Sequence, residues 1–305
     1  MPAVIADAAP ELEAILELST PIDVVATMGP LAHGRGDPTI RFAADGIWRA
    51  TRTPAGPATL RVRSVPGGVT AAAWGPGAEA AIAELADLVG ANDEPTKLEP
   101  HHPVIADLAR RLPGLRMTRS NRLFEALLPA ICEQKVTGNE ARAAFRGIVR
   151  AFGEPAPGPG GMHLPPEASV LAGLPYFAFH RFGLERRRAD LIRRTGQLAP
   201  RLDGLPPTET YRLLASLPGI GPWTLAEVGR VAFGDPDAVS VGDYHLPNLV
   251  SWALAGEPRA DDGRMLELLE PYRGQRGRVQ RLLEASGIRP PRYGPRMAPQ
   301  RIANL

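Results

Sequence analysis

Two glycines separated by one residue lie in the stretch LPGIGPWT, which spans residues 217–224 and sits between two helical patterns. Gly219 and Gly221 allow positive φ angles and a close approach of another backbone. Pro222 suits the first turn of a helix, and free amides at such a glycine-rich helix start bind anions such as phosphate. An ordinary tight turn between packed helices is the alternative, but the complete string favours the phosphate-binding turn.

A carboxylate, Asp243, lies further along in the stretch VSVGDYHLPNLV. Such a group can stabilise a developing positive charge and can orient or activate water. Aspartate is also a good helix N-cap, and a helical pattern follows over residues 244–256. On residue type alone the cap is the favoured role, although one carboxylate can serve in both.

The chain offers few side chains for a metal or a cluster. Its one cysteine, Cys132, lies in the apolar stretch LLPAICEQ and excludes a cysteine-ligated zinc site and a four-cysteine iron–sulfur cluster. His101 and His102 do not have the spacing to other ligand types that a metal site requires. We therefore predict no side-chain metal site, and we expect Cys132 to be a small buried hydrophobic residue.

Charge is distributed unevenly along the 305 residues. Residues 1–100 carry 7 basic and 13 acidic side chains, whereas residues 101–305 carry 28 and 20, for a net charge of +2. This asymmetry favours an anionic partner for the second part, with chance on a solvated surface as the alternative. No apolar run reaches transmembrane length, and the first residues lack a basic start and a cleavage site, so we expect a cytoplasmic protein without a membrane partner.

The first hundred residues predict a small α+β domain with an antiparallel sheet. Short, partly alternating stretches separated by Gly, Pro and Asp are typical of strands, and one helical pattern follows them. The expected strands span residues 22–31, 39–53, 58–65 and 68–75, and the helix spans 77–90 with a stop at Gly90. The polar stretch at 91–103 places the boundary near residue 100.

The remainder predicts a helical domain over residues 101–288 and a Pro/Arg-rich, mobile tail over 289–305. Ser120 is the expected cap of a helix that Pro129 kinks. A loop is expected over 154–166. Further helices are expected over 136–153, 184–202, 209–217, 222–234 and 265–286.

The hairpin string resembles that of the helix–hairpin–helix DNA glycosylase superfamily, and the chain is most similar to its alkylbase branch, the bacterial 3-methyladenine DNA glycosylase II family. That family has an aspartate 20 residues after the hairpin Trp, and here Trp223 is followed at that distance by Asp243. The stretch FEALLPAICEQKVTGNEA also resembles the first helical segment of the family. The resemblance covers roughly residues 38–288, and it implies a first domain like half of a TATA-binding protein.

The resemblance implies roles for particular residues. Asp243 would carry the hydrolysis of an N-glycosidic bond, which passes through an oxocarbenium-like sugar. Trp223 and Tyr272 would stack on the flipped base, with core packing as the commoner role for either ring. Tyr244 and Glu227 would also lie at the substrate, although Glu227 has a solvent-facing helix position as its alternative.

DNA would be held by the hairpin, through Gly219, Gly221 and Thr224, and by Gln134 and Lys135. Lys135 occupies the position of the wedge residue that fills the gap left by the flipped base. Bifunctional members have a lysine where this chain has Trp223, and no lysine follows residue 135, so the resemblance implies a monofunctional enzyme.

The expected partner is double-stranded DNA with damaged bases, bound by a monomer associated with the nucleoid. The expected substrate is an alkylated purine, and no cofactor is expected beyond a backbone-bound monovalent cation at the hairpin. Two alternatives stay open: excision of an oxidised or deaminated purine, and a non-catalytic DNA-binding protein.

Overall fold

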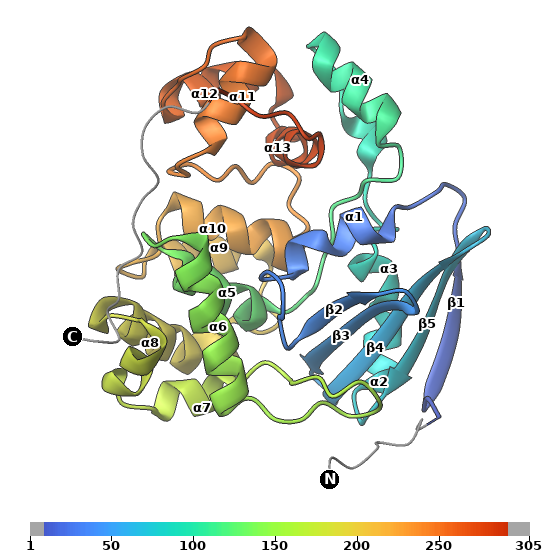
Figure 1. Cartoon of the computed structure of the whole chain (residues 1–305), viewed down its shortest axis with the longest axis vertical. Helices are drawn as coiled ribbons and strands as arrows, with labels where there is room; N and C mark the ends of the chain where they lie inside the picture. Colours follow the sequence, from blue (N-terminus) through green and yellow to red (C-terminus); the bar gives the residue numbers. More distant parts are fainter. Residues whose placement is uncertain (1–8, 292–305) are drawn as a thin grey trace.

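A computed structural model describes residues 9–291, and the predicted tail therefore lies almost wholly outside the described residues. The first part of the chain forms a five-stranded antiparallel sheet in the order β1-β5-β4-β3-β2 (Figure 1). Its strands are β1 (Leu12–Glu17), β2 (Ile40–Ala43), β3 (Gly46–Thr53), β4 (Gly56–Val65) and β5 (Gly68–Trp74). The predicted α+β domain with an antiparallel sheet, followed by helices, is confirmed.

One predicted strand is wrong, and the strand predicted over residues 39–53 is two strands, β2 and β3, joined by a turn at Ala44 and Asp45. Residues 22–31 form helix α1 (Val24–Met28) and a 3₁₀ turn, η1 (Gly29–Leu31), instead of a strand. Asp23 caps α1 by accepting a hydrogen bond from the Ala26 amide at 2.8 Å. Val24, Thr27 and Met28 are buried, at the i, i+3, i+4 spacing of one helix face. The edge strand β1 was not predicted, because its residues alternate between exposed and half-buried without a strongly apolar face.

The helices fall into two packed groups, and α2 and α3 cover the sheet (Figure 1). The first group is built around the hairpin, and the second lies above it in the same view. The sheet helices are α2 (Ala78–Ala83) and α3 (Leu85–Leu88), and a 3₁₀ turn follows at η2 (Pro95–Lys97). The hairpin group contains α5 (Leu123–Glu133), α6 (Gly138–Phe152), α7 (Ala168–Gly173), η3 (Tyr176–Phe182), α8 (Arg186–Leu202), α9 (Pro207–Ala215), α10 (Pro222–Val228) and η4 (Gly229–Phe233). The upper group contains α4 (Pro103–Arg111), α11 (Leu246–Ala255), α12 (Asp262–Leu269), η5 (Glu270–Tyr272) and α13 (Arg276–Ala285).

Several predicted helix ends need correction. Ser120 does not cap α5, which starts after Arg122; the Ser120 hydroxyl instead accepts a hydrogen bond from the Arg122 amide in the preceding turn. The single helix expected over 265–286 is divided at Pro271, where a 3₁₀ turn separates α12 from α13. Pro129 lies inside α5 as predicted, and Gly90, with φ of +72°, ends the α2–α3 segment.

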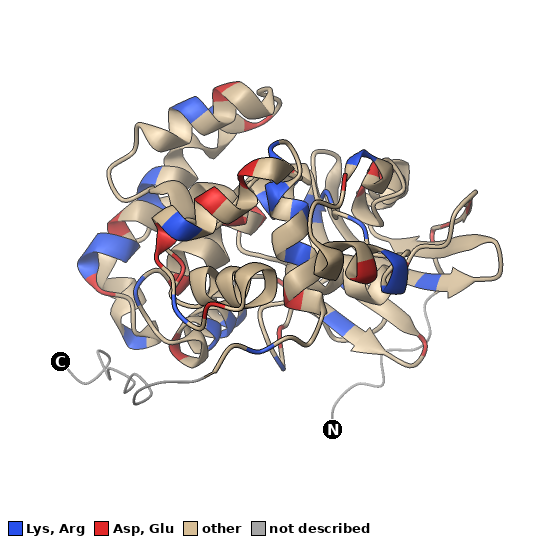
Figure 2. Ribbon diagram, turned by 90° about the horizontal axis from the view of Figure 1, so that it is seen from above, with Lys and Arg blue, Asp and Glu red and all other residues tan. Residues whose placement is uncertain are grey.

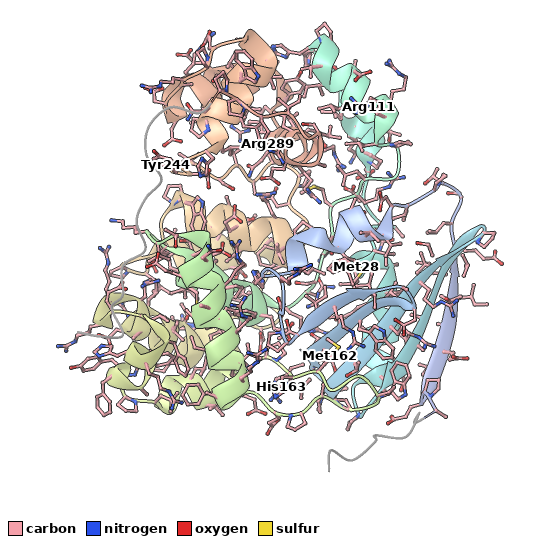
Figure 3. The ribbon with its side chains drawn as sticks, viewed as in Figure 1. Met28, Arg111, Met162, His163, Tyr244 and Arg289 are labelled. Carbon is pink, nitrogen blue, oxygen red and sulfur yellow. The ribbon has the colours of Figure 1, made fainter. Side chains whose placement is uncertain are left out.

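The sheet domain and the helices are joined by buried polar contacts. Glu125 on α5 accepts hydrogen bonds from Arg49, Thr51 and the Arg52 amide on β3, at 2.8–2.9 Å. The loop after α6 crosses the outer face of the sheet, where Met162 packs with Trp48 and Trp74 (Figure 3). These contacts show that the sheet and the helices pack against each other. The domain boundaries stay a prediction. Among residues 9–291, no helix is long and apolar enough to cross a membrane.

Candidate active site

A cleft of about 470 Å³ opens where the sheet domain and the two helical groups meet. One wall comes from η1, which contributes Gly29 and Pro30, and another comes from α5. The remaining walls come from α10 with η4, from the start of α11, and from α13. The side chains that line it include Trp223, Asp243 and Glu227, so the cleft brings together three residues that the resemblance placed at the substrate.

The hairpin is fixed to the end of α5 by one side chain. Gln134 Nε2 donates to the Gly219 carbonyl and to Thr224 Oγ1, both at 2.9 Å. Gly219 has φ of +104°, in the region that favours glycine. Gly221 has φ of −109°, and a Cβ added there would meet no atom within 4 Å. Gly219 is therefore needed for the turn itself, whereas Gly221 leaves open space beside the first turn of α10.

Asp243 lies two residues before the N-cap residue His245, holds the start of α11 with one carboxylate oxygen, and lines the cleft. Its Oδ1 accepts hydrogen bonds from the His245 amide at 2.7 Å and the Leu246 amide at 2.8 Å. Among the described residues, Oδ2 accepts no hydrogen bond, and Asp243 forms no ion pair. The preceding turn lies against Trp223, since a Cβ on Gly242 would be 3.9 Å from the Trp223 Cβ. The cap and a chemical role are therefore compatible in this geometry.

The other carboxylates of the cleft are paired. Arg230 lies between Glu227, at 3.2 Å, and Glu284, at 2.6 Å. Glu133 lies 3.7 Å from His33. The cleft lining thus has four carboxylates and two guanidiniums, those of Arg230 and Arg281. Among the described residues, Asp243 is the lining carboxylate that has no basic side chain within ion-pair distance.

Glu227 is held in the wall of the cleft and does not face solvent as a helix-surface residue would. Its Oε1 accepts hydrogen bonds from the Ser240 hydroxyl and from Arg230. Burial raises the pKa of the Glu227 carboxyl, against the opposing effect of the Arg230 guanidinium. The folded protein is therefore less stable when Glu227 is ionised than it would be if the pKa of Glu227 were the same in the folded and unfolded states.

This direction predicts a pH-dependent effect of Glu227→Gln on stability. Since the folded-state pKa is raised, wild-type stability falls as pH rises from the ordinary glutamate pKa through the raised one. The glutamine variant lacks this loss, so we expect its melting temperature relative to wild type to be higher at pH 8 than at pH 4. Thermal unfolding across this range measures the difference. A melting-temperature difference, variant minus wild type, that falls as pH rises would contradict the predicted direction.

Three other predicted site residues lie elsewhere. Tyr272 is only 2% exposed and donates to or accepts from His102 Nδ1 at 2.7 Å, so in this structure it packs in the upper helical group and does not line the cleft. Tyr244 is 82% exposed and projects from the turn before α11 (Figure 3). Lys135 is exposed, with φ of +57°, immediately after the glutamine that holds the hairpin.

Several residues that line the cleft were not predicted. Gly29 and Pro30 come from the segment expected to be a strand, and His33 follows that segment, so their place in the cleft wall was not predicted. Glu284 and Arg281 come from α13; Glu284 pairs with Arg230 at 2.6 Å, and Arg281 lies 3.9 Å from Glu284. The i, i+3 spacings of Glu227 with Arg230 and of Arg281 with Glu284 are the parts of this network that the sequence shows.

Comparison with solved structures identifies the fold. A 3-methyladenine DNA glycosylase from Archaeoglobus fulgidus superimposes with a TM-score of 0.75 at 19% identity, over 89% of this chain and 97% of that one. The chain has the helix–hairpin–helix DNA glycosylase fold. An 8-oxoguanine glycosylase/lyase from Clostridium acetobutylicum, in complex with DNA, gives a TM-score of 0.68 at 14% identity, over 90% of this chain and 99% of that one. A 3-methyladenine DNA glycosylase from Schizosaccharomyces pombe gives 0.50 at 16% identity, over 65% of this chain and 97% of that one. No family model and no curated protein sequence matches the chain significantly.

Proposed function

We propose that the protein is a DNA glycosylase of base-excision repair that removes alkylated purines from double-stranded DNA by hydrolysis. The observation that carries the proposal is Asp243, a carboxylate without a basic partner among the described residues, beside Trp223 in a cleft large enough for a base. A flipped purine would stack on the indole, and Asp243 Oδ2 would stabilise the positive charge that develops on the sugar.

The charge of the cleft favours a cationic base. Its lining carries an excess of carboxylates over guanidiniums, and an indole face adds a cation–π attraction on the order of 1–2 kcal/mol. Alkylated purines of the 3-methyladenine type carry a positive charge, whereas oxidised and deaminated purines do not. The 8-oxoguanine enzymes with the same fold make an oxidised purine the second candidate.

A lysine for Schiff-base chemistry is missing from the hairpin helix, because residue 223 is Trp and no lysine follows residue 135. We therefore propose a monofunctional enzyme in which water is the nucleophile. The hairpin cation that the resemblance implies plays no part in this step. The carbonyls of Pro218 and Gly219 accept hydrogen bonds from Arg194 and Gln134.

Base release and covalent trapping test the proposal together. We expect the protein to release 3-methyladenine from methylated duplex DNA and to form no adduct with borohydride. Parallel duplexes that contain 8-oxoguanine or hypoxanthine test the second candidate. Release of the oxidised base alone would overturn the alkylpurine assignment, a robust adduct would overturn the monofunctional one, and DNA binding without any release would indicate a binding protein.

A further inference from the structure

Helix α6 carries three arginines at four-residue intervals, Arg142, Arg146 and Arg150. This spacing places them on one face of the helix, where like charges four residues apart destabilise it. The helix is otherwise well formed, with a Thr137–Glu140 capping box at its start and a buried apolar face. The row of charges therefore does not serve the stability of α6.

No carboxylate neutralises these arginines within residues 9–291. Two nearby acidic side chains have other partners: Glu133 lies 3.7 Å from His33, and Glu154 pairs with Arg52. Arg142 donates to the Asn139 side-chain oxygen at 2.8 Å. Arg146 donates to the Arg35 carbonyl at 3.0 Å. Such contacts with neutral acceptors orient a guanidinium and leave its charge available.

The sheet domain adds a fourth charge, Arg35. Its loop lies against α6, since a Cβ on Gly34 would come within 1.9 Å of the Arg142 Cδ. Gly34 has φ of +87°, so both its conformation and this close approach call for glycine. The Arg35 side chain is exposed and forms no ion pair within the described part of the chain.

The row begins at the cleft. Lys135 stands two residues after Glu133, which lines the cleft, and one residue after Gln134, which holds the hairpin. From there α6 runs along the front of the hairpin group toward the loop that crosses the sheet (Figure 1). Elsewhere, acidic and basic positions are interspersed over most helices (Figure 2). We call the five unneutralised cations, Arg35, Lys135, Arg142, Arg146 and Arg150, the α6 basic ridge.

We propose that the α6 basic ridge is a second phosphate-binding surface, separate from the hairpin, that follows the backbone of the DNA duplex away from the lesion. The inference rests on the proposed function, which supplies duplex DNA as the partner. With about 1.5 Å of rise per residue, successive arginines stand about 6 Å apart along the axis. The 15 residues of α6 extend about 22 Å, the length of six to seven base pairs at 3.4 Å each.

The surface between the charges suits a nucleic acid more than a membrane. Ala143 and Ala151 are exposed beside the arginines, so α6 itself presents no large apolar side chain there of the kind with which amphipathic helices enter lipid. Phosphate contacts of this kind carry no sequence information, and the ridge would therefore bind damaged and undamaged duplexes alike. It would also give the sheet domain a share in holding the substrate.

The salt dependence of binding tests the ridge. The variant Arg142→Gln/Arg146→Gln/Arg150→Gln removes three charges and keeps side-chain length and helix propensity. For an undamaged 30-base-pair duplex, we expect the slope of log K against log salt to become shallower by roughly two to three, at about 0.9 per lost phosphate contact. Fluorescence anisotropy from about 50 to 300 mM salt measures the slope.

A matched control removes three charges elsewhere. Arg63→Gln/Arg110→Gln/Arg111→Gln changes β4 and α4, which lie away from α6 (Figure 1). We expect its slope to stay close to wild type, and circular dichroism should show both variants folded. An unchanged salt slope in the α6 variant, or an equal change of slope in the control variant, would contradict the proposed DNA-binding role of the α6 basic ridge.

Base release separates this outcome from that of the proposed function. At saturating enzyme, single-turnover release of 3-methyladenine by the α6 variant should stay within about twofold of wild type, because the ridge holds DNA and does not touch the reacting bond. If the wild-type protein releases no base, the proposed function is wrong, and the salt slopes still show whether the α6 basic ridge binds DNA. A tenfold or greater loss of single-turnover rate with an unchanged slope would count against the ridge.

Discussion

Asp243→Asn should lower the single-turnover rate of base excision by at least about a hundredfold, the scale of losing one preorganised electrostatic group. The asparagine side-chain oxygen can still accept the two amide hydrogen bonds that cap α11, so the fold should be retained. Only the charge is lost. Because that charge attracts the developing oxocarbenium and repels phosphate, it acts more strongly on the transition state than on bound substrate, which is the condition for catalysis.

Binding separates this effect from a loss of affinity. The variant should bind lesion-containing duplex as tightly as wild type or more tightly, because a negative charge beside the polyanion is gone. Asp262→Asn is a suitable control, since Asp262 accepts a hydrogen bond from the Gly242 amide in the same turn and does not line the cleft. Near-normal excision by folded Asp243→Asn protein would show that another carboxylate carries the reaction, with Glu227 the next to test.

The sequence predicted the fold where hydrophobic periodicity or the hairpin stretch LPGIGPWT marked an element clearly. The hairpin and the strands over residues 58–65 and 68–75 carry strong local signals, and the structure contains them, whereas the strand expected over 39–53 is divided into β2 and β3. Residues 22–31 were misassigned because an apolar decapeptide suits a strand or a buried helix equally well by composition. The Asp23 cap decides between them, and it is a single hydrogen bond at 2.8 Å.

The site was predictable only in part, because a cleft depends on packing between distant segments. Trp223 and Asp243 belong to a recognisable spacing, and they line the same cleft. The interpretation of Tyr272 as a stacking ring came from that same resemblance, but in this structure the ring is packed against His102. The contribution of η1 to the cleft wall depends on tertiary contacts, which leave no trace in the local sequence.

The last prediction concerns the charge network in the cleft wall. Arg230 is 9% exposed and pairs with both Glu227 and Glu284. Arg230→Met should lower the free energy of unfolding by about 3–5 kcal/mol, because it leaves two carboxylates in the wall without their shared counterion. Urea denaturation measures this loss as a lower midpoint with an unchanged m-value.

A rescue variant distinguishes lost charge compensation from lost packing. Arg230→Met combined with Glu227→Gln and Glu284→Gln removes Arg230 together with the two carboxylates that it pairs with, and it leaves Arg281, which lies 3.9 Å from Glu284. Most of the lost stability should return, since a buried ion network replaced by neutral groups of similar volume is often neutral in stability. If the triple variant is as unstable as Arg230→Met alone, the arginine stabilises the wall by packing. If Arg230→Met itself loses less than about 1 kcal/mol, the two carboxylates are solvated well enough to stand without it.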